Sequence, residues 1–391
     1  MNEVRGGGET GLDMKLTIER TALLKALGHV QSVVERRNTI PILSNVLLSA
    51  HAGGLSLSAT DLDMEIVDEA SAEVENTGQI TAPAHTLYEI VRKLPEGAEV
   101  SLSYTGEDPR LQVRAGRYKV NLPVLPAGDF PAMPQEGLSS PVTVDTAALI
   151  RLIDRTRFAI STEETRYYLT GIYLHTLIED GREILRAVAT DGHRLAMADM
   201  AAPEGAAGAP GVIVPRKTVQ EARRLLEDCG ETIDLQLSAQ KVRFDFGRAG
   251  LTSKVIDGSF PDYTRVIPKE NGRILTADNA LFAAAVDRVA TISSEKSRSV
   301  KLAVESGKVV MTVRNMETGQ AQEELEVDYE GPPFEIGFNA RYLLDVSAQI
   351  GAELIEMRFA DRASSAAMLD PVLVLDPTDA AAQFVLMPLR A

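Results

Sequence analysis

Hydrophobic and polar positions repeat one pattern three times along the chain. Apolar residues at helical spacing begin at Leu23, and a polar loop and an alternating, strand-like run follow them. The same order begins again at Leu149 and at Leu281, so the three starts lie 126 and 132 residues apart. A second module that reads strand, helix, strand follows in each copy. Its three copies are residues 79–104, 212–238 and 334–360.

Short motifs support the same triplication. Thr60 and Thr190 lie in matching stretches 130 residues apart, and the GDFP motif at Gly128 lies 130 residues before GSFP at Gly258. A repeat of this length is a domain rather than a solenoid turn, so we predict an α+β fold of three repeated domains. Each domain has two helices and antiparallel sheets. The predicted parts are a disordered leader or tag at 1–13 and domains at 14–138, 139–270 and 271–391, and the predicted helices are 21–37, 84–94, 146–158, 216–228, 278–292 and 339–350.

Three similar domains in a row leave two different free ends. Such ends favour head-to-tail association, which closes into a ring when the rotation between subunits permits it.

The charge is unevenly distributed over these elements. The formal net charge of −16 argues against a protein that coats nucleic acid through a basic surface. The six predicted helices, however, carry 14 Lys and Arg against 9 Asp and Glu, while the rest of the chain carries 26 against 47. One interpretation is that Lys and Arg simply favour helices. The other is that the helices share a surface that faces a polyanion.

The stretch AVATDGHRLAMADM places Asp191, His193 and Arg194 close together, as hydrolases often do. Apolar runs flank the Asp-Gly pair, so a hairpin turn is the plain structural interpretation. Catalysis needs a nucleophile with a positioned base, and the sequence has neither a GxSxG motif nor a reactive-cysteine context. We therefore predict a protein that is not an enzyme.

The sequence indicates no cofactor and no metal. None of the five histidines forms a pair at ligand spacing, and the glycines of GGGETG precede no helix, which excludes a phosphate loop. Cys229 is the only cysteine, which suits a reducing cytoplasm. No run of 18 apolar residues and no signal-peptide pattern occurs, so we expect no membrane association and a cytoplasmic location.

The motifs ATDGHRLA, RYYLTG, IVPRK, SKVIDGSFPDY, EIGFN and the terminal VLMPLR together resemble the bacterial DNA polymerase III beta subunit, the DNA sliding clamp. The resemblance spans residues 14–391. It implies a head-to-tail homodimer in which six domains form a ring around duplex DNA, with the helices lining the hole. Such a ring contacts phosphates without sequence specificity, acts as processivity factor of the replicative polymerase, and has no catalytic residues.

The resemblance also implies that TDGHR belongs to a partner-peptide pocket between the second and third domains. The expected partners are the polymerase alpha subunit, the clamp loader, and other DNA polymerases and repair proteins that carry Gln-Leu-x-Leu-Phe-type peptides. The implied pocket residues are Arg166, Leu169, Thr190, Gly192, His193, Arg194, Leu195, Pro261, Arg265, Val266, Asn339, Tyr342, Ser365, Val385, Leu386, Met387, Pro388, Leu389 and Arg390.

Two further residue sets follow from the resemblance and the charge split. The expected DNA-facing residues are Arg37, Arg151, Arg155, Arg216, Lys217, Arg223 and Arg224. The expected dimer interface brings Thr291 and Ile292 of one chain to Arg117, Lys119, Val120 and Leu122 of the other.

Two features depart from the family pattern or lack an assigned role. Ser297 stands where the family pattern allows an aromatic residue, and the smaller serine would leave one pocket wall more open. The insertion-like stretch 370–382 lengthens the last hairpin. Two other classes of protein stay open on the residues alone. An acidic scaffold that binds only proteins would not need basic helices, and an unrecognised hydrolase would need a nucleophile.

Overall fold

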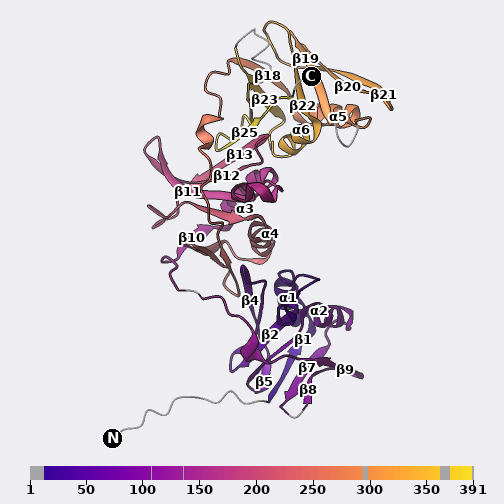
Figure 1. Cartoon of the computed structure of the whole chain (residues 1–391), viewed down its shortest axis with the longest axis vertical. Helices are drawn as coiled ribbons and strands as arrows, with labels where there is room; N and C mark the ends of the chain where they lie inside the picture. The colour runs from indigo at the N-terminus through magenta and orange to yellow at the C-terminus, as the bar shows by residue number, and fades with distance from the viewer. Residues whose placement is uncertain (1–12, 107, 135, 294–297, 362–369, 390–391) are drawn as a thin grey trace. The chain divides into compact units, whose positions relative to one another are not determined.

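The computed structural model describes residues 13–389 except 107, 135, 294–297 and 362–369. The described chain forms two compact units (Figure 1). One unit contains the residues up to 146 together with 220–255, and the other contains 147–219 together with 256–391. The division therefore runs through the predicted second domain, and the sheets explain why.

The first unit contains two antiparallel sheets. Strands β17 and β4 pair in register from Ala249 opposite Asp68 to Ser253 opposite Met64, which joins second-domain strands to first-domain strands in one eight-stranded sheet. Its strand order is β10 (Val142–Asp145), β15 (Thr232–Leu237), β16 (Lys241–Asp245), β17 (Ala249–Lys254), β4 (Met64–Ala70), β3 (Gly54–Thr60), β2 (Asn45–His51) and β6 (Gly78–Pro83). The five-stranded sheet has the order β5 (Glu73–Asn76), β1 (Met14–Glu19), β7 (Glu99–Thr105), β8 (Asp108–Ala115) and β9 (Tyr118–Pro123).

The second unit repeats this construction. Strands β13 and β25 pair from Arg194 opposite Leu386 to Ala198 opposite Ala382, which joins the second and third domains. The eight-stranded sheet has the order β14 (Val212–Pro215), β11 (Gly171–Glu179), β12 (Arg182–Thr190), β13 (Arg194–Ala201), β25 (Ala382–Leu386), β24 (Val372–Leu375), β23 (Leu354–Phe359) and β18 (Arg273–Asp278). The four-stranded sheet has the order β21 (Gly319–Glu326), β20 (Lys308–Asn315), β19 (Ser299–Glu305) and β22 (Phe334–Asn339).

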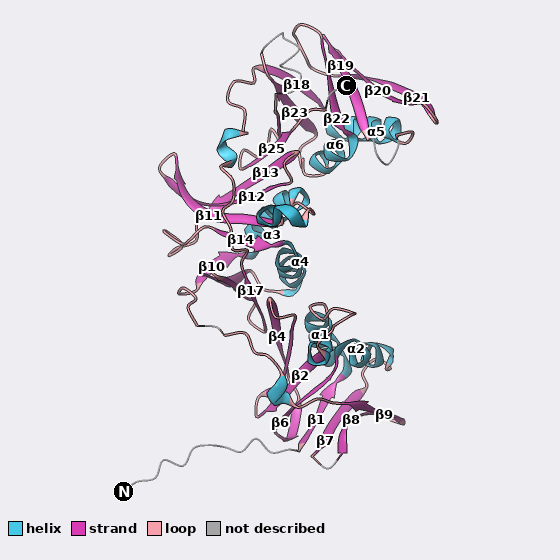
Figure 2. Ribbon diagram, in the orientation of Figure 1, coloured by secondary structure: helices cyan, strands magenta, loops and turns pink. Residues whose placement is uncertain are grey.

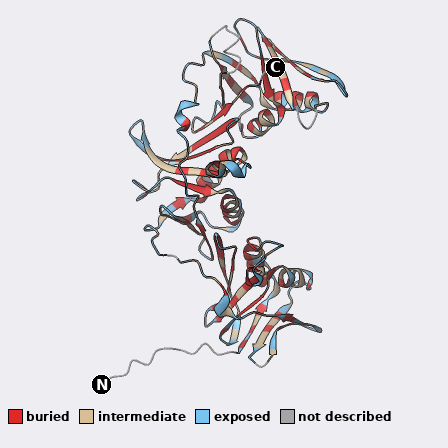
Figure 3. Cartoon of the chain, viewed as in Figure 1, coloured by how far each residue is buried: buried red, intermediate tan, exposed pale blue. Residues whose placement is uncertain are grey.

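Six α-helices occur in the described residues, each near its predicted position (Figure 2). Apolar residues three and four positions apart bury one face of each helix against a sheet, as the red residues of Figure 3 show for α1, whose buried residues include Leu23, Leu27 and Val30. The strand, helix, strand order of the second module is confirmed in all three copies. The helices are α1 (Arg20–Gln31), α2 (Ala84–Lys93), α3 (Thr146–Thr156), α4 (Arg216–Leu225), α5 (Asn279–Ala290) and α6 (Ala340–Ser347).

The predicted extent of the first helix, 21–37, was wrong at its end. The α-helix stops at Gln31, where the hydroxyl of Ser32 donates to the carbonyl of His29 (3.0 Å) and to Glu221 (2.7 Å). The amides of Val33 and Val34 then donate to the carbonyls of Val30 and Gln31, three residues back. This is the hydrogen-bond pattern of a 3₁₀ turn, which is tighter than an α-helix and ends it here. The ends of α3 and α4 also change to 3₁₀ turns, η3 (Arg157–Ala159) and η5 (Leu226–Asp228).

A charged cluster connects first-domain and second-domain segments within the first unit. His29 is buried, and its Nδ1 lies 2.6 Å from Asp68 while its Nε2 lies 3.0 Å from Asp228. Arg224 donates to the His29 carbonyl at 2.7 Å, and Lys25 lies 3.3 Å from Asp228. The hydrogen bond from His29 lowers the pKa of Asp228, and the nearby Lys25 ammonium acts in the same direction.

Candidate functional site

Segments that are far apart in the sequence surround one cavity of about 160 Å³ in the second unit. They are the end of η4 (Glu164–Leu169), the β12–β13 turn, the residues around η6 (Tyr263–Arg265), and the last strand with the residue that follows it. The lining is mostly apolar. The lining residues are Leu169, Thr190, Gly192, Arg194, Leu195, Pro261, Asp262, Tyr263, Val266, Val385 and Met387. All except Asp262 and Tyr263 belong to the pocket set predicted from the sequence.

The Asp-Gly stretch forms the predicted hairpin turn between β12 and β13. The side chain of Asp191 accepts hydrogen bonds from the amides of His193 (2.9 Å) and Arg194 (3.0 Å), and Gly192 has a φ of 87°. A Cβ atom at Gly192 would lie 2.6 Å from Nη1 of Arg166, so a larger residue would push this predicted pocket residue away. The turn therefore fixes one wall of the cavity through the backbone.

The first domain contains the same turn, which shows the repeat at the level of hydrogen bonds. Asp61 accepts from the amides two and three residues later, and Thr60 donates to Met64, as Thr190 donates to Arg194. Leu62 takes the left-handed position of Gly192, with a φ of 78°.

Arg194 is buried beneath the cavity and its guanidinium has several partners. It pairs with Asp345 of α6, lies 3.2 Å from Asp191, and donates to the carbonyl of Phe158 at 2.7 Å. Its guanidinium carbon also lies 4.4 Å from the ring centre of Tyr342. These contacts connect the TDGHR turn to the third-domain helix α6.

A polar network contacts Tyr263, one of the residues that line the cavity. The hydroxyl of Tyr263, a lining residue, lies 3.0 Å from Nε2 of His175. Arg186 forms a bidentate pair with Asp199, with both distances at 2.7 Å. Burial is the largest single influence on the pKa of Arg186 and lowers it, but the hydrogen bonds and charges of Asp199 and Tyr263 together outweigh burial and raise this pKa. Burial lowers the pKa of His175, and the charge of Arg186 lowers it further.

Asp262 and Tyr263 were missed by the sequence analysis. They lie between the predicted residues Pro261 and Arg265, so their position in SFPDYTRV was the available signal. Tyr263 packs in a core cluster with Leu195 and Val385 and also faces the cavity, a double role that sequence alone does not separate.

The other predicted pocket residues are not among those that line the cavity, and some of them lie outside the described residues. The His193 and Tyr342 rings stack with their centres 6.4 Å apart, and Asn339 caps α6 by accepting from the Arg341 amide. Arg265 is exposed and pairs with Asp262. Leu386 and Pro388 are buried and Leu389 is exposed. Ser365 and Arg390, and with them Ser297, lie outside the described residues.

The predicted DNA-facing residues lie on helices or beyond the end of one. Arg37 is exposed, and Arg216 and Lys217 begin α4. Four of these residues have carboxylates nearby in the described part of the chain: Arg151 pairs with Asp379, Arg155 with Asp376 and Asp379, Arg223 with Glu227, and Arg224 with Glu221.

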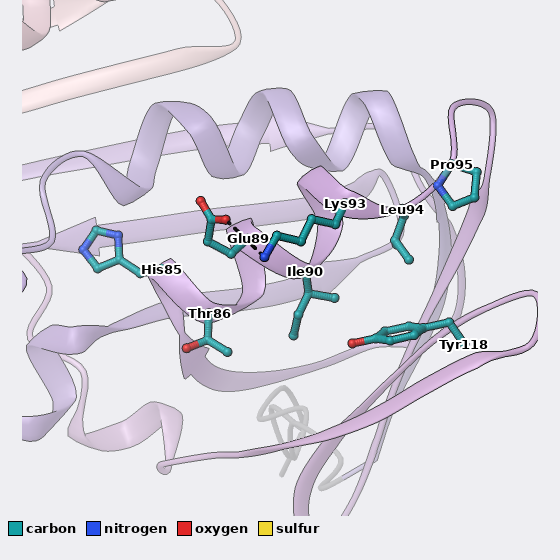
Figure 4. Close-up of a pocket in the computed structure, with 8 residues that line it drawn as sticks. All are labelled: His85, Thr86, Glu89, Ile90, Lys93, Leu94, Pro95 and Tyr118. Carbon is teal, nitrogen blue, oxygen red and sulfur yellow. Dashed lines mark ion pairs between the residues drawn. The ribbon is translucent and has the colours of Figure 1, made fainter.

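The predicted dimer residues lie on edge strands or beside a helix end. Arg117 lies in the β8–β9 hairpin, and Lys119, Val120 and Leu122 lie on the edge strand β9. Thr291 and Ile292 follow α5. A cavity of about 630 Å³ opens beside β9 (Figure 4), where Thr86 and Ile90 of α2 face Tyr118. Its full lining is His85, Thr86, Glu89, Ile90, Lys93, Leu94, Pro95 and Tyr118.

Neither a metal-binding cluster nor a membrane-spanning helix occurs in the described part of the chain. No group of three or more His, Cys, Asp or Glu side chains there is arranged to hold a metal ion. No helix there is long and apolar enough to cross a membrane.

Comparison with known proteins assigns the chain and its fold to one class of protein. Residues 14–134, 143–262 and 264–390 match the models of the N-terminal, central and C-terminal domains of the DNA polymerase III beta subunit. The beta sliding clamp of Caulobacter vibrioides is 72% identical over 96% of this chain and 100% of the relative. A crystal structure of the Caulobacter crescentus beta sliding clamp has a TM-score of 0.94 at 71% identity and covers 98% of this chain and 100% of that one. The Bartonella birtlesii clamp bound to griselimycin has a TM-score of 0.93 at 45% identity, over 97% and 100%.

The class is therefore the DNA sliding clamps, which are processivity factors of replicative DNA polymerases and have no catalytic activity. The chain belongs to the DNA polymerase III beta subunit family.

Proposed function

We propose that two copies of this chain associate head to tail into a ring around duplex DNA in the cytoplasm, and that each copy tethers its partners through the 160 Å³ pocket. The pocket accepts peptides of the Gln-Leu-x-Leu-Phe type from the polymerase alpha subunit, the clamp loader, and other DNA polymerases and repair proteins. The three domains are 14–138, 139–270 and 271–391.

One observation carries the peptide assignment. The cavity is apolar and open, while the charged groups around it are already paired with each other. Arg194 has Asp345 and Asp191, and Asp262 has Arg265, so the cavity offers apolar surface rather than a reactive group. Buried apolar anchors dominate the affinity of such sites, and the polar groups of the 190–194 turn fix orientation.

The dimer proposal rests on the exposed ends of the two units. β9 and β21 are both edge strands, and the cavity beside β9 has an apolar floor that includes Ile90 and Leu94. We assign this cavity to the end of α5 in a second copy, with Ile292 as the inserted side chain. Burying Ile292 there excludes water from both surfaces.

The DNA contacts come from the helices and are made to phosphates. Arg37 and Arg216 are the strongest candidates because both are exposed, whereas Arg151, Arg155, Arg223 and Arg224 have carboxylate partners within the described part of the chain. Such contacts weaken steeply with salt.

The decisive experiment is retention on DNA. The protein, loaded onto nicked circular DNA, should stay bound through a gel-filtration column and should be released when a restriction enzyme linearises the circle. Equal retention on linear and circular DNA would contradict encirclement, and binding of a fluorescent Gln-Leu-x-Leu-Phe-type peptide tests the pocket independently.

A further inference from the structure

The loop between β24 and β25, residues 376–381, is the centre of the insertion-like stretch to which the sequence assigned no role. Asp376 is buried and organises it. Its carboxylate accepts from the amide of Gly351 (2.7 Å) and from the amide (2.9 Å) and hydroxyl (2.7 Å) of Thr378. Burial raises the pKa of Asp376, but these hydrogen bonds outweigh burial, so its pKa lies below the usual value. The loop therefore has a fixed shape.

The loop reaches across to the second-domain helix α3. Both carboxylate oxygens of Asp379 lie near Nη1 of Arg151, at 3.0 and 2.7 Å, while Nη2 of Arg151 donates to the carbonyl of Asp199 at 2.7 Å. Arg155 lies 3.5 Å from Asp379 and 3.9 Å from Asp376. The amide of Asp199 also bonds to the carbonyl of Ala381 at 2.8 Å, which fixes the loop against the end of β13.

These carboxylates balance the charge of α3 and the 3₁₀ turn η3 that follows it. The two elements carry three arginines and one aspartate, and the loop supplies two more carboxylates. A phosphate group would approach Arg151 in the same way as the Asp379 carboxylate does, because both present paired oxygens to the guanidinium. The Arg151 side chain remains 36% exposed, so a phosphate and Asp379 compete for one reachable group.

We propose that Asp379 is an internal competitor for DNA: it holds Arg151, and with it Arg155, away from the phosphates, so that α3 attracts DNA weakly and the ring moves freely along it. This proposal rests on the DNA-facing role of the helices stated above. A ring that slides needs many weak contacts, since each arginine bound to a phosphate adds to the salt-dependent affinity and slows movement.

The test removes the charge of Asp379 and follows the loaded dimer on DNA. Asp379→Asn is nearly isosteric and retains an acceptor for the Ala381 amide, which Asp379 binds at 3.2 Å. We expect slower one-dimensional diffusion of the loaded ring, measured by single-molecule tracking. We also expect the slope of log affinity against log salt to steepen by about 0.9 per chain, which changes affinity about threefold between 50 and 200 mM salt.

Three matched variants define the outcome. Asp245→Asn removes the same charge from an Arg–Asp pair on β16, where Arg243 lies 3.1 Å away, and should leave diffusion and slope unchanged. Asp379→Glu should behave like the wild type, and Arg151→Gln added to Asp379→Asn should reverse the gain. Asp379→Ser removes the charge in a second way, should the first variant fold poorly, and thermal unfolding and light scattering report folding and dimerisation.

The results separate this proposal from the clamp function itself. If Asp379→Asn and Asp379→Ser diffuse like Asp245→Asn while the wild type is retained on circular DNA, the competitor proposal is wrong and the loop only connects the domains. If the wild type is not retained on circular DNA at all, the encirclement proposal is wrong. The slope of log affinity against log salt on linear DNA then still tests whether Asp379→Asn frees Arg151.

Discussion

Removal of residues 387–391 should destroy peptide binding without unfolding the protein. Met387 lines the cavity, whereas the paired part of β25 ends at Leu386. In the described part of this tail, the deletion removes two backbone hydrogen bonds, from Met387 to His193 (2.9 Å) and from Leu389 to Gly337 (2.8 Å). At about 0.5–1.5 kcal/mol each, they cost about 1–3 kcal/mol of stability. The pairing of β25 with β13 and β24 remains, so the unit should still fold.

The same deletion should also weaken peptide binding. Burying a methionine side chain against an apolar ligand contributes about 1.5–3 kcal/mol. Loss of that wall should weaken a Gln-Leu-x-Leu-Phe-type peptide at least tenfold, or about 1.4 kcal/mol. Fluorescence anisotropy of a labelled peptide measures the change. Met387→Ala should give part of the effect, and Met316→Ala, at a fully exposed position in the β20–β21 hairpin, should give none.

The refuting result is specific. If the truncated protein binds the peptide as tightly as the wild type, while its dimer and thermal unfolding are unchanged, the peptide site lies elsewhere and the role given to TDGHR is wrong. If the truncated protein unfolds at a much lower temperature, the tail contributes more to the core than its two hydrogen bonds indicate, and Met387→Ala then decides the site.

Three further predictions concern assembly, DNA and pH. Ile292→Asp should give a monomer by light scattering, because a buried charge costs about 2 kcal/mol or more, and a tight dimer would exclude this interface. Arg37→Glu with Arg216→Glu should shorten retention on nicked circular DNA with the dimer intact, whereas unchanged retention at low salt would contradict the DNA-facing assignment. Asp228→Asn should lower the free energy of unfolding at pH 7, measured by thermal unfolding, by under about 1 kcal/mol, since the carboxylate is half exposed. Because folding lowers the pKa of Asp228, its stabilisation is present above the unfolded-state pKa of about 4 and disappears as pH falls through the folded value, so the two melting curves should converge in acid.

The sequence predicted the elements well where the residues themselves determine the backbone. Asp191 and Gly192 specify a turn by side-chain acceptance and by a positive φ, and the hairpin forms there. The limits of the helices were predicted less well, because they depend on partners that lie far away in the sequence. α1 ends where Ser32 donates to Glu221, 189 residues later, and no local pattern contains that contact.

The site shows the same division between local signals and distant contacts. The apolar residues of the predicted pocket converge on one cavity because the ends of β12, β13 and β25 meet in one sheet. The repeat pattern predicted three similar domains, but it did not predict that β13 and β25 join two of them. Tyr263 was missed in the sequence because it packs in the core cluster and also lines the cavity, and its position in the sequence does not distinguish these two roles.

The charge split between helices and strands, counted along the sequence, describes a surface only once the ion pairs of the charged side chains are known. A count along the sequence treats each arginine of α3 as available to a polyanion, yet Asp379 lies 228 residues from Arg151 and binds it with two oxygens. Pairing of this kind reduces the field that a helix presents to DNA, because opposite charges at hydrogen-bond distance act outward as a dipole. Arg37 makes no such contact with a carboxylate of the described residues. It is exposed and lies beyond the end of α1. On the proposed DNA-facing role of the helices, the attraction for DNA would therefore depend on exposed positions such as Arg37 more than on the total number of basic residues.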